Sequence, residues 1–224
     1  MKSIIGNKWQ NLNEIMRFDK ENGVPATFFI GVSKGRYLCY SLEQTIFWIM
    51  RIMKEGFEAG VQGIAYNNIE NIKREHEIFR RISGLNYFGI RMHYLMTSEN
   101  TVKYLNEVGY LFDSTIYEMK NPYRVGMMWE FPLHIMDGYI LCKGRKWQNQ
   151  NLEQAKETTK KRIEEVFSRD INYLTILFHD RYFDDAFKTW KNWYIWVISY
   201  LKGNGFEFIN YRDAIKEITT SYLK

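Results

Sequence analysis

Short apolar runs alternate with longer amphipathic stretches from one end of the chain to the other. The short runs carry hydrophobic residues at odd and even positions alike, which is typical of strands buried on both faces. The clearest strands are predicted at 26–32, 57–61, 87–90, 110–112 and 173–178. Weaker strand patterns occur at 129–132 and 139–142, and a last strand is predicted at 206–209.

The stretches between the strands show the periodicity of amphipathic helices. Helices are predicted at 7–22, 41–55, 69–82, 98–108, 152–168, 190–201 and 211–218. Ser41 and Gln44 form a capping box at one helix start, and glycines follow several helix ends. Strands that alternate with helices indicate parallel pairing through βαβ units. The pattern predicts an α/β fold with about seven parallel strands, as an incomplete barrel or an open doubly wound sheet.

Composition narrows the class of protein. The 224 residues are 46% hydrophobic and 17% aromatic, which suits one domain over 1–224 and argues against disorder. The net charge is +5, but no block of five or more basic residues suggests a nucleic-acid partner. Cys39 and Cys142 lack metal-ligand spacing and are predicted to be free thiols. No apolar stretch is long enough to span a membrane, so we expect a cytoplasmic location.

Polar side chains follow four of the predicted strands directly. Gln62, Arg91, Asp113 and His179 each stand just after a buried run. The carboxyl ends of parallel strands converge on one face of a barrel or open sheet, where active sites are built. We therefore expect these four residues around one cleft.

Each of these residues has a structural and a functional interpretation. His179 is a candidate general acid or base, or a core histidine satisfied by hydrogen bonds. Arg91 could clamp an anion, orient a carboxylate or form a structural ion pair. Asp113 is a candidate catalytic carboxylate, or it caps a turn with Ser114 and Thr115.

Several segments together resemble the polysaccharide deacetylase family, also called the NodB-homology fold or carbohydrate esterase family 4. Residues 89–94, Gly-Ile-Arg-Met-His-Tyr, are similar to the family's Arg-x-Pro-aromatic motif, with His93 in place of the proline. Residues 177–179, Leu-Phe-His, fit its closing Leu-x-His motif. The other matching segments are 23–29, 55–63, 109–115 and 131–137, so the resemblance extends over about residues 7–218.

The resemblance implies a deformed (β/α) barrel and the removal of N- or O-acetyl groups from a polysaccharide. It implies a divalent metal, usually zinc, that polarises the acetyl carbonyl and activates water. In this sequence His179 would protonate the leaving group, Arg91 would orient a catalytic aspartate, and Leu177 would line the acetyl pocket. The catalytic residues expected are His179, Arg91 and Asp113. The substrate contacts expected are Leu177, Tyr94 and Trp129.

The chain departs from the family at the metal site. The family's paired aspartates precede the segment matched at 23–29, but residues 2–7 contain no acidic residue. Gln62 stands where a metal-binding histidine is usual, and residues 66–68 lack its histidine partner. A neutral amide is a poor zinc ligand beside imidazole or carboxylate. The ligands for the implied zinc are therefore not present in the sequence.

Three functional hypotheses follow. The first is a deacetylase-type hydrolase with an atypical or weakened metal site, acting on an acetylated poly- or oligosaccharide; one explanation of the missing ligands is a first strand upstream of Met1. The second is a catalytically inactive homologue that binds glycan or assists polysaccharide biosynthesis. The third is an unrelated barrel hydrolase that uses His179 and Asp113 without a metal.

Overall fold

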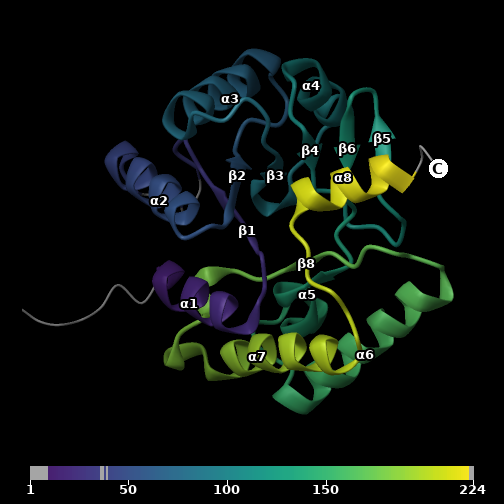
Figure 1. The fold of residues 1–224 in the computed structure, drawn as a ribbon. Helices are drawn as coiled ribbons and strands as arrows, with labels where there is room; N and C mark the ends of the chain where they lie inside the picture. The colour runs from purple at the N-terminus through teal and green to yellow at the C-terminus, as the bar shows by residue number, and fades with distance from the viewer. Residues whose placement is uncertain (1–9, 36–37, 39, 222–224) are drawn as a thin grey trace, which may run out of the picture. The chain divides into compact units, whose positions relative to one another are not determined.

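A computed structural model describes residues 10–35, 38 and 40–221. The fold is α/β with mostly parallel strand pairing, as predicted (Figure 1). The chain divides into two compact units, each assembled from two separate segments. The two-stranded unit comprises residues up to 24 and 133–208, and the six-stranded unit comprises 25–132 and residues from 209 onward. The expectation of one domain stays a prediction.

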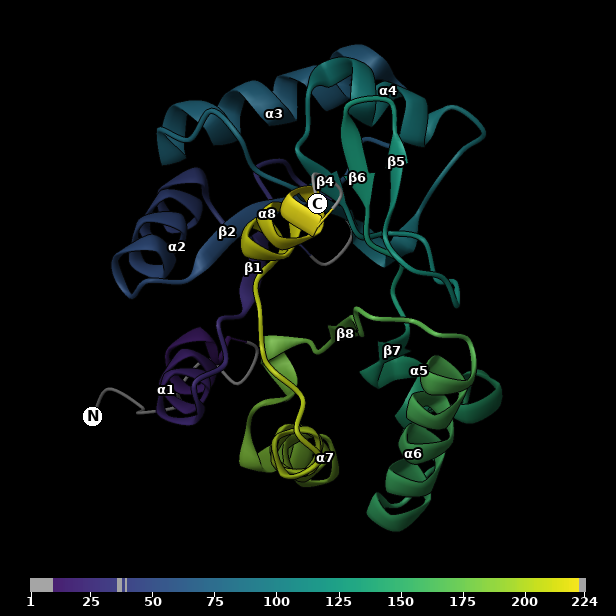
Figure 2. The same ribbon diagram turned by 45° about the vertical axis from the view of Figure 1, so that its right-hand side comes forward.

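The six-stranded unit contains one sheet in the order β1-β2-β3-β4-β6-β5. Its pairings are parallel except that β5 runs antiparallel to β6. Figure 2 shows α8 on a different side of this sheet from α3 and α4. The strands are β1 (Thr27–Ile30), β2 (Glu58–Gly63), β3 (Ile90–Met92), β4 (Phe112–Asp113), β5 (Tyr123–Val125) and β6 (Met128–Glu130). The helices are α2 (Leu42–Lys54), α3 (Ile69–Ser83), α4 (Thr101–Val108) and α8 (Tyr211–Ser221).

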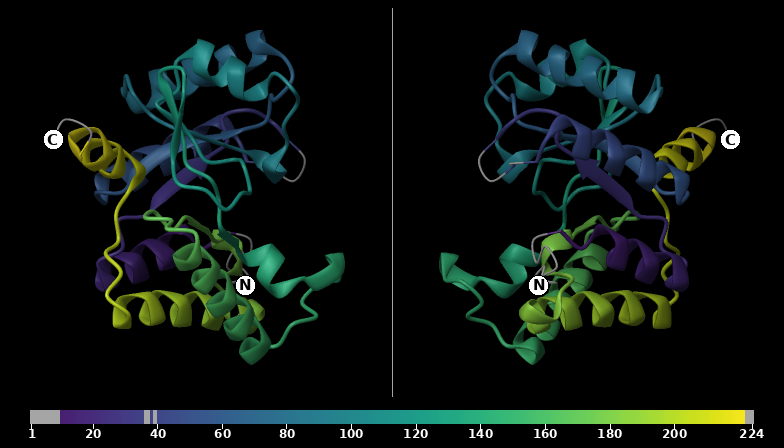
Figure 3. Two further views of the ribbon diagram at one scale, coloured as in Figure 1. Left: turned by 90° about the vertical axis from the view of Figure 1, so that its right-hand side faces the viewer. Right: turned by 90° about the vertical axis from the view of Figure 1, so that its left-hand side faces the viewer.

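The two-stranded unit pairs β7 (Ile135–Met136) with β8 (Ile176–Leu177) in parallel. Helices α6 and α7 pack side by side in this unit (Figure 3). Trp193 of α7 is buried, and its Nε1 donates to Thr159 Oγ1 of α6 at 2.9 Å, so this bulky core ring keeps its polar atom satisfied. The helices are α1 (Leu12–Asn22), α5 (Asp137–Leu141), α6 (Leu152–Ser168) and α7 (Lys188–Gly203).

Two of the strand predictions are wrong. Residues 139–142 belong to α5 and the turn that follows it, and the strand of this region is β7, immediately before Asp137. Residues 206–209 have no strand pairing. Seven of the eight strands in the described residues nevertheless pair in parallel, which agrees with the number expected.

Two sequence-based expectations concern membranes and thiols. Across the residues that the structure describes, every helix is too short or too polar to cross a membrane. Cys142 is a free thiol, as predicted. Cys39 lies outside the described residues, and so does the segment 2–7 that lacks the family's aspartates.

Candidate functional site

Three of the residues predicted to meet at strand ends lie on neighbouring strands of the six-stranded unit. Gln62 of β2 is the register partner of Arg91 of β3. Ile90, one residue earlier on β3, is the partner of Asp113 on β4. The topology therefore brings together Gln62, Arg91 and Asp113. The fourth residue, His179, belongs to the two-stranded unit and is described with it.

Arg91 holds the end of β3 to the segment after β4 and to α8. Its Nε donates to Ser114 O at 2.8 Å, and its Nη2 donates to Ser114 Oγ at 2.8 Å and to Tyr211 Oη at 2.6 Å. The guanidinium also lies over the Phe29 ring, 4.6 Å from its centroid. Only 8% of Arg91 is exposed, so this residue is a buried clamp within its unit.

Asp113 and Glu130 form a buried carboxyl pair across β4 and β6. They are register partners, and neither residue is exposed. Thr115 Oγ1 donates to Asp113 Oδ1 at 2.5 Å, and Ile116 N donates to Glu130 Oε1 at 3.2 Å. The second oxygens, Asp113 Oδ2 and Glu130 Oε2, are buried and have no hydrogen-bond partner among the described residues when both carboxyl groups are ionised.

Burial controls the protonation of this pair. Loss of hydration raises the pKa of Asp113 to about 6. Burial and the nearby Asp113 charge raise the pKa of Glu130 much further. Glu130 is therefore protonated at neutral pH, and its hydroxyl is a donor available to Asp113. The pair carries one negative charge rather than two.

The side chain of Gln62 is hydrogen-bonded to a neighbouring histidine. Its Nε2 lies 2.9 Å from His93 Nδ1, and since the amide nitrogen is the donor, Nδ1 accepts. The next residue, Tyr94, has φ +55°, in the left-handed region that non-glycine residues rarely adopt, and its ring centroid lies 4.3 Å from that of His93. Gln62 stands where the sequence resemblance places a metal ligand, and its amide is hydrogen-bonded to an imidazole instead.

The described residues do not fit the zinc ion that the resemblance implies. Among residues 10–35, 38 and 40–221, no group of three or more His, Cys, Asp or Glu side chains could hold a metal ion. At Gln62 the hydrogen-bonded pair consists of one amide and the His93 imidazole. Catalytic zinc requires three protein ligands of the imidazole, carboxylate or thiolate type.

The two-stranded unit contains an Asp–His dyad. His179 Nδ1 lies 2.9 Å from Asp137 Oδ1 and 3.0 Å from Oδ2. Asp137 Oδ2 also accepts the backbone N–H of His179 at 2.8 Å, and Oδ1 accepts that of Gly138 at 2.5 Å. The Asp137 side chain is fully buried, whereas 39% of the His179 side chain is exposed. The carboxylate fixes the Nδ1–H tautomer and leaves Nε2 to accept or donate a proton.

The dyad follows from the pairing of β7 and β8. Met136 and Leu177 are register partners, so Asp137 and His179 emerge just beyond the same ends of two parallel strands. His134 strengthens this pairing, because its Nδ1 accepts the Thr175 N–H at 3.0 Å within the buried interior. His134 is therefore a structural histidine, whereas His179 is the one placed for chemistry.

The three expected substrate contacts differ in exposure. Tyr94 is 56% exposed. Leu177 of β8 is 8% exposed, and Trp129 of β6 is 3% exposed with the Arg124 guanidinium 4.5 Å from its ring centroid. Tyr94 is thus the member of this set that offers an aromatic face to solvent. The assignment of all three as substrate contacts stays a prediction.

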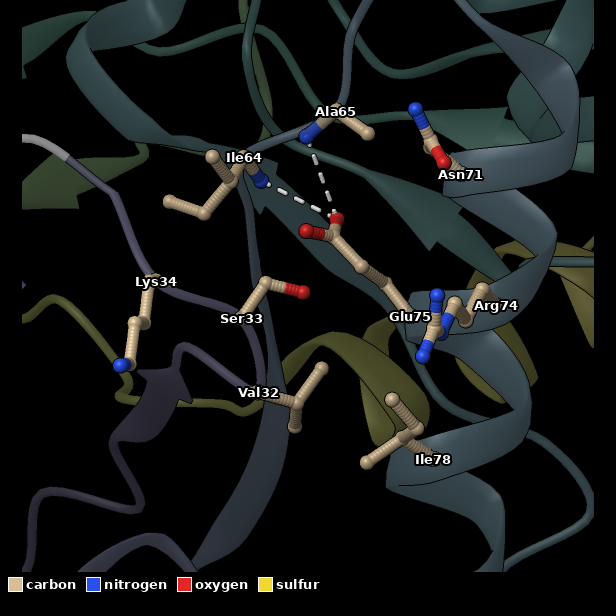
Figure 4. Close-up of a pocket in the computed structure, with 9 residues that line it drawn as sticks. All are labelled: Val32, Ser33, Lys34, Ile64, Ala65, Asn71, Arg74, Glu75 and Ile78. Atoms are coloured by element: carbon tan, nitrogen blue, oxygen red, sulfur yellow. Dashed lines mark hydrogen bonds between the residues drawn. The ribbon is translucent and has the colours of Figure 1, made fainter. Parts of the chain in front are cut away.

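A pocket of about 470 Å³ lies beyond the carboxyl ends of β1 and β2 (Figure 4). Its floor contains Glu75 of α3, whose Oε2 accepts the N–H groups of Ile64 and Ala65 at 3.1 and 3.3 Å. Ser33 is a further hydrogen-bond partner, and its hydroxyl points toward the carboxylate. Burial raises the pKa of Glu75. Glu75 therefore fixes the loop that follows Gln62, and this pocket is separate from the Asp113–Glu130 pair.

Sequence reasoning did not single out Asp137, Glu130 or Tyr211. A signal existed for Asp137, because it follows the apolar pair Ile135-Met136 just as Asp113 follows its own apolar run. Glu130 is the last residue of β6 but lies inside the predicted strand 129–132, and Tyr211 begins a helix, so neither position has a sequence pattern that marks it.

Comparison with known proteins adds to this geometry. No family model matches the chain, and no curated protein matches it. A candidate polysaccharide deacetylase from Mycobacterium smegmatis has a similar structure, with a TM-score of 0.69 and 17% identity over 96% of this chain and 78% of that one. A candidate polysaccharide deacetylase from Pseudomonas aeruginosa is also similar, with a TM-score of 0.66 and 18% identity over 92% of this chain and 71% of that one.

A third similar structure is a pseudoenzyme of the CE4 family from Bacillus anthracis. It gives a TM-score of 0.52 and 13% identity over 94% of this chain and 62% of that one. At these identities the likenesses establish the fold. This chain has the NodB-like deacetylase fold, in the deformed form that the sequence resemblance implies.

Proposed function

We propose that this protein is a polysaccharide deacetylase-like hydrolase that removes N- or O-acetyl groups from a glycan. The observation that carries the proposal is the Asp137–His179 dyad. A buried carboxylate orients a partly exposed imidazole through Nδ1, which is the arrangement an acid–base histidine needs. The likeness in fold to two candidate polysaccharide deacetylases supports the choice of substrate class.

His179 would manage the proton of the leaving group. Water adds to the acetyl carbonyl, and the bond from that carbon to the sugar nitrogen or oxygen breaks. The departing atom takes the proton of His179 Nε2. Of the two protons of the attacking water, one stays on the acetic acid formed and the other passes to His179 Nε2, which restores the starting imidazolium. The Asp137 charge stabilises the imidazolium before the transfer. General acid catalysis of this kind contributes about 10²–10⁴-fold.

Arg91 and Asp113 enter the proposal as the residues that shape the strand ends of the six-stranded unit. Arg91 ties the segment after β4 to α8, and Asp113 shares one charge with Glu130. Their direct catalytic roles stay predictions.

A second candidate function is glycan binding without hydrolysis. The pairing of Gln62 with His93, in the place where the family holds a metal ligand, favours it. One of the similar structures is itself a pseudoenzyme of the CE4 family. In this case the same fold would bind an oligosaccharide and release no acetate.

Acetate release from N-acetylated chito-oligosaccharides and from O-acetylated xylan separates the two candidates. We expect the parent to release acetate and His179→Ala and Asp137→Asn to lose about 10²–10⁴-fold of that rate. Asp185→Asn is a matched control, because its side chain is 91% exposed and nearby in sequence.

A fully active His179→Ala variant would overturn the hydrolase proposal. Saturable oligosaccharide binding without acetate release would replace it with the second candidate. If the protein neither binds nor deacetylates either glycan, both candidate functions lose their basis.

The proposal includes a cytoplasmic location, which the free thiol of Cys142 supports. It also takes a poly- or oligosaccharide rather than a nucleic acid as partner, because the basic residues are dispersed among acidic ones.

A further inference from the structure

Helix α2 has two apolar faces, and only one of them is buried. Thr45, Ile49 and Ile52 point into the six-stranded unit, where α2 packs on β1, β2 and α3. The other face exposes four large apolar side chains. They are Leu42 at 51%, Ile46 at 41%, Phe47 at 58% and Met50 at 51%. Figure 1 shows α2 at the edge of its unit.

This outer face is a contiguous patch rather than a set of scattered residues. Leu42, Ile46 and Met50 are spaced by four residues, so they form one row along the helix, and Phe47 lies beside that row. Exposed apolar patches with polar edges mark interaction sites on soluble proteins. A helix face that serves only to contact solvent would have polar residues at these four positions.

The charges along the same face are self-complementary. Glu43 stands in the first turn of α2 and Lys54 in the last. Eleven residues separate them in sequence, which brings them to within about 20° of each other around the helix axis. One line along the surface therefore begins with a negative charge and ends with a positive one, with Phe47 and Met50 between them.

A two-fold antiparallel arrangement of two such helices pairs the two charges and the two central apolar residues of this face. With the axis at the middle of α2, Phe47 of one copy meets Met50 of the second copy. The same symmetry places Glu43 opposite Lys54 of the second copy, twice in each pair. An isologous contact requires this kind of self-complementary patch.

We propose that the outer face of α2 binds the same face of a second copy of this chain, in an antiparallel helix pair. The inference is independent of the proposed function. One helix face buries less than the ~800 Å² per partner of a standard interface. The dimer is therefore weak, with a dissociation constant in the micromolar range or above, and its population depends on protein concentration.

Sedimentation equilibrium of the full chain over a wide concentration range tests the contact. We expect the mass of the parent to rise from one chain toward two, and Phe47→Glu to stay at one. Met127→Glu is the matched control, because Met127 is 82% exposed at the turn between β5 and β6, and it should behave as the parent. Circular dichroism establishes that each variant is folded.

Charge exchange tests the orientation. Glu43→Lys and Lys54→Glu each create two like-charged pairs in a homodimer and should weaken it about tenfold. An equimolar mixture of these two variants restores both attractive pairs, so we expect a heterodimer at least as stable as the parent dimer.

Several results would overturn the proposal. They are a parent that remains monomeric at every concentration, a Phe47→Glu variant that still dimerises, and a mixture of charge variants no more associated than either alone.

Discussion

Asp113 and Glu130 stand opposite each other in the parallel register of β4 and β6, and neither residue is exposed to solvent. Two ionised carboxylates at this spacing would repel each other in a medium that hydrates neither. One proton retained on Glu130 removes that repulsion and supplies a donor for Asp113. The stability of the protein should therefore respond to pH through this pair.

Asp113→Asn should flatten part of the pH dependence of unfolding. Because burial raises the pKa of Asp113 in the folded state to about 6, the folded state holds this proton over a pH range in which the unfolded state has lost it. The free energy of unfolding of the parent therefore falls between about pH 4 and 6, by about 3 kcal/mol from this group. Urea titrations across pH 4–7 measure it. Parallel curves for parent and variant would contradict the assignment.

Glu130→Gln should be nearly neutral in stability. A protonated Glu130 has the shape and the donor capacity of glutamine, so the substitution should cost less than about 1 kcal/mol at pH 7. Glu130→Ala removes that donor and opens a cavity beside a charged Asp113, and should cost about 2–5 kcal/mol. Equal losses in the two variants, measured by chemical denaturation, would show that Glu130 is ionised in the folded state.

Asp137→Asn should change the tautomer of His179. The amide that this substitution introduces can offer an N–H toward Nδ1, which moves the ring proton to Nε2. Nitrogen-15 NMR of the imidazole reads the tautomer directly, without reference to any activity. We expect Nδ1–H in the parent and Nε2–H in the variant. An unchanged spectrum would mean that the carboxylate does not set the tautomer.

Tyr211→Phe and Tyr211→Ala should separate a hydrogen bond from ring packing. The Tyr211 hydroxyl receives a hydrogen bond from Arg91, and its ring stacks on Phe112 at a centroid distance of 4.5 Å. Loss of the hydroxyl alone should cost about 1 kcal/mol, and loss of the ring about 3–5 kcal/mol. Equal costs in denaturant titrations would contradict the role given to the ring.

Gln62→His should create a two-imidazole metal site. His93 Nδ1 already lies 2.9 Å from the Gln62 amide, so a histidine at position 62 would bring two imidazoles within reach of one ion. Calorimetry with Ni²⁺ and Zn²⁺ should show tighter binding than by the parent, and Gln62→His/His93→Ala should lose that gain. Tight one-to-one binding by the parent would instead reveal a ligand set outside the described residues.

The sequence predicted best where local signals agree. Residues 152–168 were predicted as a helix, and α6 has these bounds. Asn151 accepts from Gln154 N at 2.9 Å, while the Gln154 side chain accepts from Asn151 N at 3.0 Å. This cap and a long amphipathic period are both encoded within the segment, so no tertiary contact is needed to infer them.

Short apolar segments were predicted least well. Tyr-Ile-Leu-Cys at 139–142 and Phe-Glu-Phe-Ile at 206–209 have strand-like composition. The first is helical and the second has no pairing partner. Four residues cannot distinguish a buried helix turn from a strand, and a strand exists only if another strand lies beside it.

In the candidate site, too, local features were predicted from the sequence and features that depend on tertiary contacts were not. The rule that polar residues follow buried strands marked Arg91, Asp113 and His179 from sequence alone. It could not reveal that Asp137, 42 residues from His179, is the carboxylate that holds the imidazole. That relationship depends on the register of β7 against β8, which no local pattern encodes.

The interleaving of the two units sets a condition on how the chain can fold during synthesis. The six-stranded unit needs α8, and the two-stranded unit is interrupted by residues 25–132. Domains usually complete their folding in the order in which they leave the ribosome. Here the phenylalanine cluster around Tyr211 and the full hydrogen bonding of Arg91 must wait until residue 211 emerges. The strand end at Arg91 therefore gains its contact with Tyr211 only when α8 is made, long after β1–β6.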